Sequence, residues 1–182
     1  MATIIDEIFA LYRRHGSAAY FGESVSMTEH GLQAAHFARE GGAGPALIVA
    51  ALLHDVGHLV EDVPQDIADW SRDAEHERVG GAWLARRFPP QVSEPVRLHV
   101  PAKRYLLATD RDYLAKLSPA SLVTLKLQGG PMSPVEALRF EAEPFCRDAV
   151  LIRRCDDRGK VPGLATPSLE DFAPMIEALA RG

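Results

Sequence analysis

The chain has 182 residues, of which 47% are hydrophobic, so it is long and apolar enough for one globular domain with a substantial core. Its formal net charge of −5 argues against a nucleic-acid groove and against an anionic membrane surface. The longest apolar run, near residues 45–53, is too short to span a bilayer, and charges inside the apolar N-terminal segment exclude a signal peptide. Two cysteines without C-x-x-C spacing suggest a reduced compartment. We therefore expect one cytoplasmic domain over residues 1–182.

The N-terminal third of the chain carries clear helix signals. Apolar residues at helical spacing predict a first helix over residues 3–14. A loop of small residues follows, and Ser26 with Glu29 has the spacing of a capping box. We therefore expect a second helix to begin there and to end at Gly41-Gly42.

The remaining elements are also predicted to be helical. Pro45 suits the first position of a third helix, which is expected to run to the pair His54-Asp55 and to be followed by a polar loop containing Trp70. Proline and glycine residues divide the rest of the chain into further predicted helices at 74–88, 92–100, 102–108, 110–116, 119–128, 133–142, 144–159 and 168–180. Strand-like alternation is nearly absent. The predicted fold is all-α.

The pair His54-Asp55 is the strongest sign of chemistry, because it ends an apolar stretch in which an unpaired carboxylate would be costly. A metal ion would remove that cost, and a carboxylate with two oxygens can bridge two ions. Other histidine and aspartate residues, each weak evidence alone, complete a nitrogen- and oxygen-rich set without sulfur, which suits Fe, Mn, Co, Ni or Zn. The expected ligands of a two-metal site are His30, His54, Asp55, His76, His99 and Asp156.

Two positions near these ligands leave alternatives open. His58 lies four residues after His54 and could share its helical face, but Gly57 intervenes. We therefore expect His58 to face the substrate rather than to bind metal. In the stretch L151-I-R-R-C-D-D, either Asp156 or Asp157 could be the ligand.

The order H…HD…H…H…D resembles the HD-domain superfamily, which would make the fold an HD-domain helical bundle around a dinuclear metal site. Most members of that superfamily are metal-dependent phosphohydrolases. A smaller branch consists of mixed-valent diiron oxygenases, which include myo-inositol oxygenase and the phosphonate-degrading (PhnZ-type) enzymes. The ligand order alone is shared by both groups.

The segments around the ligands are similar to the phosphonate-degrading branch from about residue 12 to residue 160. They are Y20-F-G-E-S-V-S-M-T-E-H, H76-E-R-V-G-G-A-W-L, R97-L-H-V-P-A-K-R-Y-L, S118-P-A-S-L-V-T-L-K-L-Q-G-G and R153-R-C-D-D-R-G-K. The resemblance implies that Tyr20 and Glu23 form a lid, with the Tyr20 hydroxyl able to occupy an open metal position. It also implies that Asp156, rather than Asp157, binds metal.

The resemblance further implies how the ligands and the substrate contacts are divided. His30, His54, Asp55 and Asp156 would hold one iron, and His76 and His99 would hold the other, with Asp55 bridging the Fe(II)/Fe(III) pair. The expected substrate contacts are Gln33, which lies one turn after His30, together with His58, Lys103, Ser121, Thr124 and Arg153. Arg153 is expected to act as a planar fork and Lys103 as a point charge.

The implied partners are a small phosphonate and O2, and the implied reaction is oxidative cleavage of a C–P bond. The first expected substrate is (R)-1-hydroxy-2-aminoethylphosphonate, which would yield glycine. Its N-trimethyl analogue, yielding glycine betaine, is close behind, and a nitrogen-free 1-hydroxyphosphonate is the third candidate. The alternative is an HD phosphohydrolase in which two metals activate a hydroxide against a nucleotide or phosphate ester.

Overall fold

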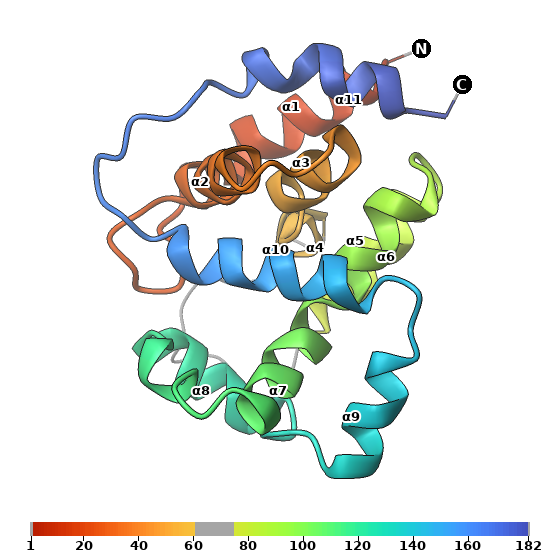
Figure 1. The fold of residues 1–182 in the computed structure, drawn as a ribbon. Coiled ribbons are helices and arrows are strands. Elements are labelled where there is room, and N and C mark those ends of the chain that lie inside the picture. Colours follow the sequence, from red (N-terminus) through yellow and green to blue (C-terminus); the bar gives the residue numbers. More distant parts are fainter. Residues whose placement is uncertain (1, 61–74, 182) are drawn as a thin grey trace.

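The computed structural model describes residues 2–60 and 75–181, and it confirms the all-α prediction (Figure 1). The helices are α1 (Ile4–His15), α2 (Met27–Glu40), α3 (Pro45–Leu52), α4 (Val56–Val60), α5 (His76–Ala85), α6 (Pro90–Arg97), α7 (His99–Thr109), η2 (Leu114–Lys116), α8 (Pro119–Leu127), α9 (Pro134–Glu141), α10 (Cys146–Arg158), η3 (Glu170–Phe172) and α11 (Ala173–Leu179). Every helix in the described part of the chain is too short or too polar to cross a membrane. The predicted loop around Trp70 lies outside the described residues.

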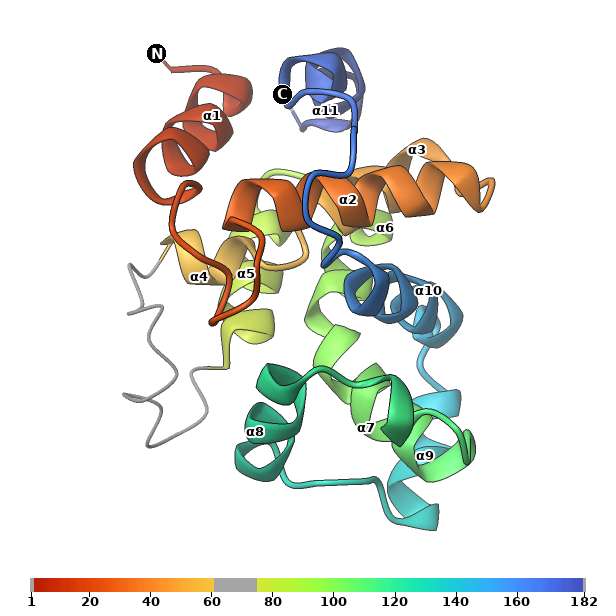
Figure 2. The same cartoon turned by 90° about the vertical axis from the view of Figure 1, so that its left-hand side faces the viewer.

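Helix α10 crosses the middle of the molecule between two groups of helices. In both ribbon views α1, α2, α3 and α11 lie on one side of it, and α7, α8 and α9 lie on the other (Figures 1 and 2). Helix α10 packs against α2, α3, α6 and α7. Its side chains therefore face both groups, which places its last two turns at the boundary where the candidate site lies.

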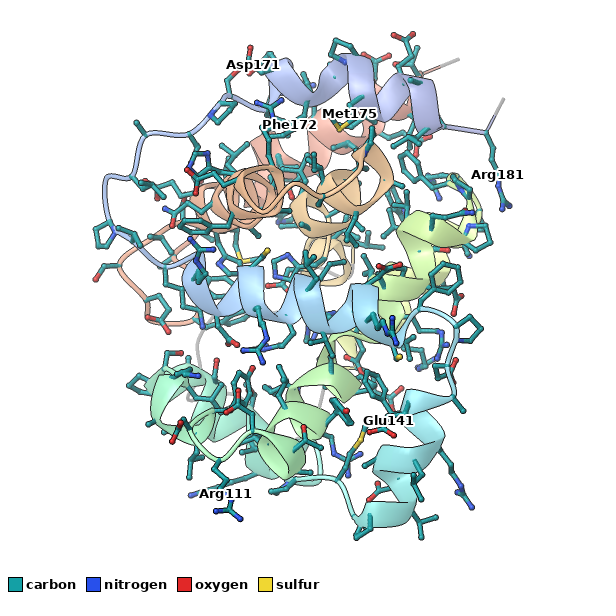
Figure 3. The ribbon with its side chains drawn as sticks, viewed as in Figure 1. Arg111, Glu141, Asp171, Phe172, Met175 and Arg181 are labelled. Atoms are coloured by element: carbon teal, nitrogen blue, oxygen red, sulfur yellow. The ribbon has the colours of Figure 1, made fainter. Side chains whose placement is uncertain are left out.

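The largest hydrophobic core lies around α2 and α3 and extends to the C-terminal segment. Ile8, Leu52, Ile152 and Phe172 are fully or almost fully buried in it. In Figure 3 charged side chains such as those of Arg111 and Arg181 extend outwards from the ribbon. Two smaller clusters lie on the other side of α10: Leu98, Ala102, Phe140 and Ala149, and Leu106, Tyr113, Leu117 and Leu125. These clusters fix the position of α7 and α8 relative to α10.

The predicted third helix was too long. Helix α3 ends at Leu52, so His54 and Asp55 lie in a turn between α3 and α4. Side chains bind the last carbonyls of α3: the Tyr12 hydroxyl donates to Leu52 O at 2.7 Å, and the His54 ring donates to Ala51 O at 2.8 Å. These bonds satisfy carbonyls that the helix leaves free at its end. The turn directs both side chains into the site.

Other boundaries also differ from the prediction. The segment 110–116 contains only the short 3₁₀ helix η2, because Asp110 adopts an extended conformation and its carboxylate accepts from Asp112 N at 3.1 Å. Pro101 does not separate two helices. It lies in the first turn of α7, where its missing N–H has no helical partner to lose. The capping box of Ser26 and Glu29 is confirmed.

Candidate metal centre and anion pocket

The six predicted ligands come together in one buried cluster. They come from four helices and the turn after α3, and each residue is at most 8% exposed: His30 (α2), His54 and Asp55 (turn), His76 (α5), His99 (α7) and Asp156 (α10). Such a concentration of buried polar groups needs partners, because desolvation otherwise makes it unfavourable.

One group of ligand atoms lies between α2, the turn and α10. The Nε2 atoms of His30 and His54 are 3.1 Å apart. Asp55 Oδ2 lies 3.5 Å from His30 Nε2 and 3.3 Å from His54 Nε2. Asp156 Oδ1 lies 3.4 Å from His30 Nε2. Four side chains thus converge on one small volume.

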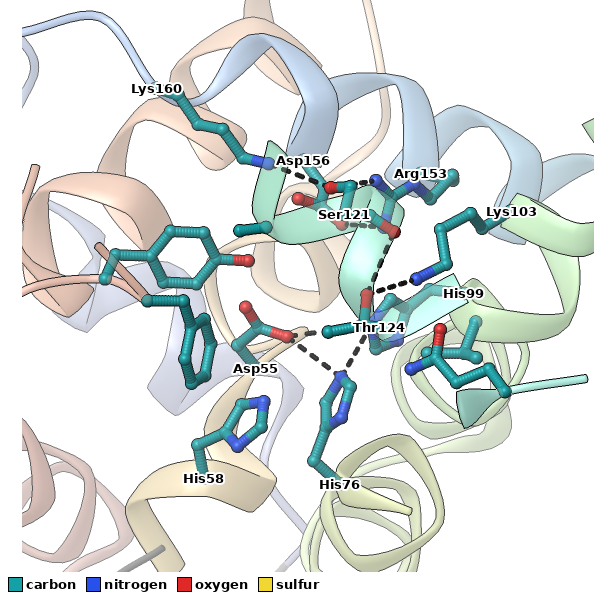
Figure 4. A pocket seen from close by; sticks show the side chains of 15 residues that line it. Asp55, His58, His76, His99, Lys103, Ser121, Thr124, Arg153, Asp156 and Lys160 are labelled. Carbon is teal, nitrogen blue, oxygen red and sulfur yellow. Dashed lines mark hydrogen bonds and ion pairs between the residues drawn. The ribbon is translucent and has the colours of Figure 1, made fainter. Parts of the chain in front are cut away.

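The other oxygen of Asp55 belongs to a second group. Asp55 Oδ1 lies 3.3 Å from His76 Nε2 and 3.6 Å from His99 Nε2, and these two nitrogens are 3.1 Å apart (Figure 4). Asp55 therefore offers one oxygen to each group, which is the arrangement that a bridging carboxylate requires. Two sets of three residues could each hold a metal ion: His30 with His54 and Asp55, and Asp55 with His76 and His99.

Backbone carbonyls orient three of the histidine rings. Their Nδ1 atoms lie 2.7–2.8 Å from carbonyl oxygens: His30 from Gly159, His54 from Ala51 and His99 from Val96. Because a carbonyl oxygen can only accept, Nδ1 carries a proton and Nε2 is the ring nitrogen that points into the cluster. Metal-binding histidines are commonly oriented in this way.

The geometry of the cluster fits metal ions. Asp55 Oδ2 and Asp156 Oδ1 are buried without a hydrogen-bond partner among the described residues, although both lie amid imidazole nitrogens. Two ligands each about 2.1 Å from one ion would be about 3.0 Å apart at a right angle and about 3.4 Å apart in a tetrahedral arrangement. The observed separations of 3.1–3.6 Å lie within about 0.2 Å of the range between these values.

Asp55 and His99 have the charge states of metal ligands, whereas His54 does not. Burial raises the pKa of Asp55, but the facing His54 and the hydrogen-bonding imidazoles outweigh it and hold that pKa well below its usual value. Burial and then His76 lower the pKa of His99 to about 3. Burial lowers the pKa of His54, but Asp55 outweighs it and raises the pKa to about 9. Metal binding would therefore have to displace a proton from His54.

A small cavity lies beside this cluster, and cationic side chains line the wall opposite the candidate ligands. It has a volume of about 30 Å³, and Lys103, Arg153 and Lys160 line it together with Ser121 and Thr124. In Figure 4 these five side chains lie on one side of Asp55 and His76. A cavity between candidate metal ligands and three cations suits an anion that also reaches the metals.

Lys103 and Thr124 are paired at this wall. The Lys103 ammonium donates to Thr124 Oγ1 at 3.0 Å, and the lysine is 2% exposed. Burial, and then the neighbouring Arg153, lower the pKa of Lys103 to about 7. An anion in the cavity would offset both effects.

Lys160 is a cavity residue that sequence reasoning missed. Its Nζ donates to Ser118 Oγ at 3.1 Å and to Ser121 Oγ at 3.2 Å, and lies 3.8 Å from Glu23 Oε1. One available signal was that the segment R153-R-C-D-D-R-G-K, which resembles the phosphonate-degrading branch, ends at Lys160. Its position four residues after Asp156 does not establish a shared face, because α10 ends at Arg158. Lys160 therefore connects the Glu23 loop to the start of α8.

Arg153 is more heavily engaged than predicted. Its Nη1 donates to Asp156 Oδ2 at 2.6 Å, its Nη2 forms an ion pair with Asp157, and its Nε donates to the Tyr113 hydroxyl at 2.9 Å. Only a long contact of 3.4 Å joins Nη2 to Ser121 Oγ. The planar guanidinium that was expected to bind substrate is therefore directed mainly at the two carboxylates. The same contacts distinguish the two aspartates, since Asp156 Oδ1 reaches the cluster and Asp157 binds Tyr113.

The loop that carries Tyr20 and Glu23 closes over the cluster. The Tyr20 ring stacks on the His30 ring with centroids 3.8 Å apart, and Tyr20 is 7% exposed. Burial, then Asp55 and Asp156, raise the pKa of Tyr20, so it remains a neutral phenol. Glu23 has one buried oxygen that faces Lys160. Both residues thus lie where the predicted lid would be.

The structure places the last two predicted substrate contacts, His58 and Gln33, in different surroundings. His58 lines the cavity and stacks on His76 with ring centroids 4.0 Å apart, as expected of a neighbour that is not part of the ligand groups. Gln33 is different, and its predicted substrate contact needs correction. Its amide donates to Val161 O at 2.8 Å and accepts from Val161 N at 2.9 Å, so both ends are occupied and it anchors the backbone after α10.

Comparisons with known proteins agree with this geometry. Residues 27–157 match the model of the HD domain. The chain is 43% identical over 175 residues to a hydroxymethylphosphonate dioxygenase of Gimesia maris, which covers 96% of this chain and 87% of that protein. It is 40% identical over 176 residues to a [1-hydroxy-2-(trimethylamino)ethyl]phosphonate dioxygenase (glycine-betaine-forming) of Leisingera caerulea, covering 97% and 90%. It is also 34% identical to an uncharacterised protein of Acanthamoeba polyphaga mimivirus, covering 97% and 82%.

Proposed function

Since the chain belongs to the HD-domain family, and within it to the phosphonate-degrading branch, we propose that it is a dioxygenase that cleaves the C–P bond of a small 1-hydroxyphosphonate. The products would be a carboxylate and inorganic phosphate. The observation that carries this proposal is the position of the three-cation wall directly beside the two groups of candidate ligands. An anion held at that wall would have its neighbouring carbon next to the metals.

The proposed cofactor is a pair of iron ions in the Fe(II)/Fe(III) state. His30, His54, Asp55 and Asp156 would hold one ion, and His76 and His99 would hold the other with Asp55 as the bridge. Bound there, the ions would supply the one-electron chemistry that lets O2 react with a C–H bond. The second group has fewer protein ligands, which leaves room for a substrate hydroxyl and a phosphonate oxygen.

The chain's own cations would orient the phosphonate. Lys103 and Lys160 each lie on the cavity with ammonium groups that already donate to hydroxyl oxygens. A dianion would accept from both ammonium groups and from the hydroxyls of Ser121 and Thr124. Arg153 would contribute mainly its positive charge, because its guanidinium N–H groups already donate to Asp156 and Asp157. Charge-assisted hydrogen bonds of this kind are short and directional.

The remaining cavity residues would exclude water and manage protons. The reaction would convert one substrate and one O2 into one carboxylate, one hydrogen phosphate and one proton. One C–H bond and the C–P bond of the substrate would break, and both oxygen atoms of O2 would be incorporated into the products. Burial, and then His76, lower the pKa of His58 far below its usual value, so it is a neutral imidazole able to hydrogen-bond the substrate. Tyr20 covers the cluster and would have to move when substrate enters.

Three substrates define the class that we propose. They are (R)-1-hydroxy-2-aminoethylphosphonate, its N-trimethyl analogue and nitrogen-free hydroxymethylphosphonate, which share the hydroxyl, C1 and the phosphonate. The two named relatives act on the second and the third by their names. The shared part is what the cation wall and the ligand groups would hold.

The test is phosphate release from each of the three substrates by iron-loaded protein, with O2 uptake followed in parallel. We expect one phosphate for each O2 consumed, and the fastest substrate identifies the substituent on C1 that the enzyme prefers. Cleavage of phosphate esters with Mn or Co under anaerobic conditions, without turnover of any hydroxyphosphonate, would refute the dioxygenase and support an HD phosphohydrolase.

A further inference from the structure

Tyr113 is a buried tyrosine at the edge of the site that the proposed chemistry does not use. It immediately precedes η2 and is 1% exposed, and its ring belongs to the small apolar cluster beside α8. Its hydroxyl accepts from Arg153 Nε at 2.9 Å and donates to Asp157 Oδ2 at 2.5 Å. Burial raises the pKa of Tyr113, so the proton that it donates is retained.

Tyr113 and Asp157 hold the two sides of one guanidinium. Asp157 forms an ion pair with Arg153 Nη2, and Tyr113 accepts from the adjacent Nε. Arg153, Asp156 and Asp157 stand at positions i, i+3 and i+4 of α10 and therefore share a helix face. With those contacts made, the remaining Nη1 is directed at Asp156.

Arg153 in turn distinguishes the two oxygens of Asp156. Oδ2 accepts from Arg153 Nη1 at 2.6 Å and lies 3.9 Å from His54 Nε2. Oδ1 is buried, has no hydrogen-bond partner among the described residues, and lies 3.4 Å from His30 Nε2. One oxygen is thus held by the guanidinium and the other is available to a metal.

We propose that Tyr113 and Asp157 are positioning residues that hold Arg153 across Asp156, so that this aspartate presents a single oxygen, Oδ1, to the first metal ion. The inference rests on the proposed metal centre but not on the identity of the substrate. It means that the ligand strength of Asp156 is set by a residue 43 positions earlier in the chain, acting through Arg153.

Tyr113 and Asp157 can affect Asp156 because the charge of Arg153 is shared between two carboxylates. Both Asp156 and Asp157 lie against one guanidinium, so neither takes the whole of its charge. If Tyr113 or Asp157 is altered, Arg153 is free to turn further onto Asp156 or away from it. Either movement takes Oδ1 out of the position in which it faces the first metal ion, so that ion binds more weakly. Partners that orient a ligand typically contribute about 10- to 100-fold to metal affinity.

The test is the affinity of Tyr113→Phe for Co(II), measured by competition with a chelator, together with the visible spectrum of the bound ion. The variant retains the ring and its apolar packing and loses only the hydroxyl. We expect one of the two Co(II) ions to bind about 10- to 100-fold more weakly, with a changed spectrum, and the other to bind as before. Asp157→Asn should weaken the same ion.

A second pair of variants separates positioning from general stability. In an Arg153→Gln background the additional change Tyr113→Phe should leave Co(II) affinity unchanged, because the pathway from Tyr113 is already broken. Losses that add in the double variant would overturn the inference, since Tyr113 would then act independently of Arg153. Co(II) binding by Tyr113→Phe with wild-type affinity and spectrum would also overturn it.

Tyr105 provides the matched control. Its hydroxyl donates to Glu141 Oε1 at 2.8 Å, a similar phenol–carboxylate bond at an exposed position away from the cavity. Tyr105→Phe should bind both Co(II) ions normally, and a loss equal to that of Tyr113→Phe would refute a specific role. If the wild-type chain itself binds no Co(II), the proposed metal centre is wrong, and the inference that rests on it is wrong too.

Discussion

Replacing Lys160 with methionine tests the part of the anion pocket that sequence reasoning missed. Methionine retains much of the side-chain length and removes only the charge and its donors. Lys160 donates to the hydroxyls of Ser118 and Ser121 and lies 3.8 Å from Glu23 Oε1. In the proposed complex one of its N–H groups would turn to the bound anion.

The size of the effect follows from that contact. A hydrogen bond to a charged group contributes about 1.5–3 kcal/mol, which corresponds to about a 10- to 150-fold change in a dissociation constant. We therefore expect Lys160→Met to raise the dissociation constant of inorganic phosphate by that factor in the metal-loaded protein. The ligand groups do not include Lys160, so metal content should remain normal.

Isothermal titration calorimetry with phosphate measures this constant directly. Lys116→Met is the matched control, because Lys116 also lies 3.8 Å from a carboxylate oxygen, that of Asp110, but its side chain is 54% exposed. The control should bind phosphate like the wild type. Unchanged affinity in Lys160→Met, or an equal loss in Lys116→Met, would show that Lys160 does not bind the anion.

Three further predictions concern the ligands, the pH dependence and the packing of the site. Asp55→Ala removes the proposed bridge and should abolish binding of both metals, and metal analysis that finds two ions per chain would contradict this assignment. Burial and then Arg153 lower the pKa of Lys103 to about 7, so a rise in pH above 7 removes its proton. Affinity for sulfate, whose own charge is constant in this range, should then fall by up to about tenfold per pH unit, and Lys103→Met should lose this dependence. Gly57→Ala would place a Cβ 2.0 Å from His76 O, a backbone atom, so α5 must shift. The cost of overpacking is about 1–3 kcal/mol, and calorimetry should show a melting temperature lower by about 2–12 °C. Gly44→Ala, which meets nothing within 4 Å, is the control, and an equal decrease there would refute the packing argument.

Features that depend on neighbouring residues were predictable from the sequence. The capping box of Ser26 and Glu29 acts over three residues, and its two hydrogen bonds are present. The pair His54-Asp55 stood out because a carboxylate at the end of an apolar stretch needs a compensating partner. The exact end of α3 was not predictable, since the bond from Tyr12 to Leu52 O spans 40 residues.

The candidate ligands could also be predicted from the sequence. Few residue types bind metal ions, and the segments that flank these residues resemble one family. Their division into two groups through Asp55 was an expectation from that resemblance, and only the folded chain shows one oxygen facing each group.

Contacts between distant segments became visible only in the folded chain. Gln33 binds the backbone of Val161, 128 residues away, and does not line the cavity. Arg153 meets Tyr113, 40 residues earlier, and so serves carboxylates more than an anion. The residue types showed which side chains could form a metal site, and the capping box showed where α2 begins. The pairing of these side chains depends on the packing of α10 between two groups of helices. That packing brings together residues that are far apart in the sequence, and no local sequence pattern predicts such contacts.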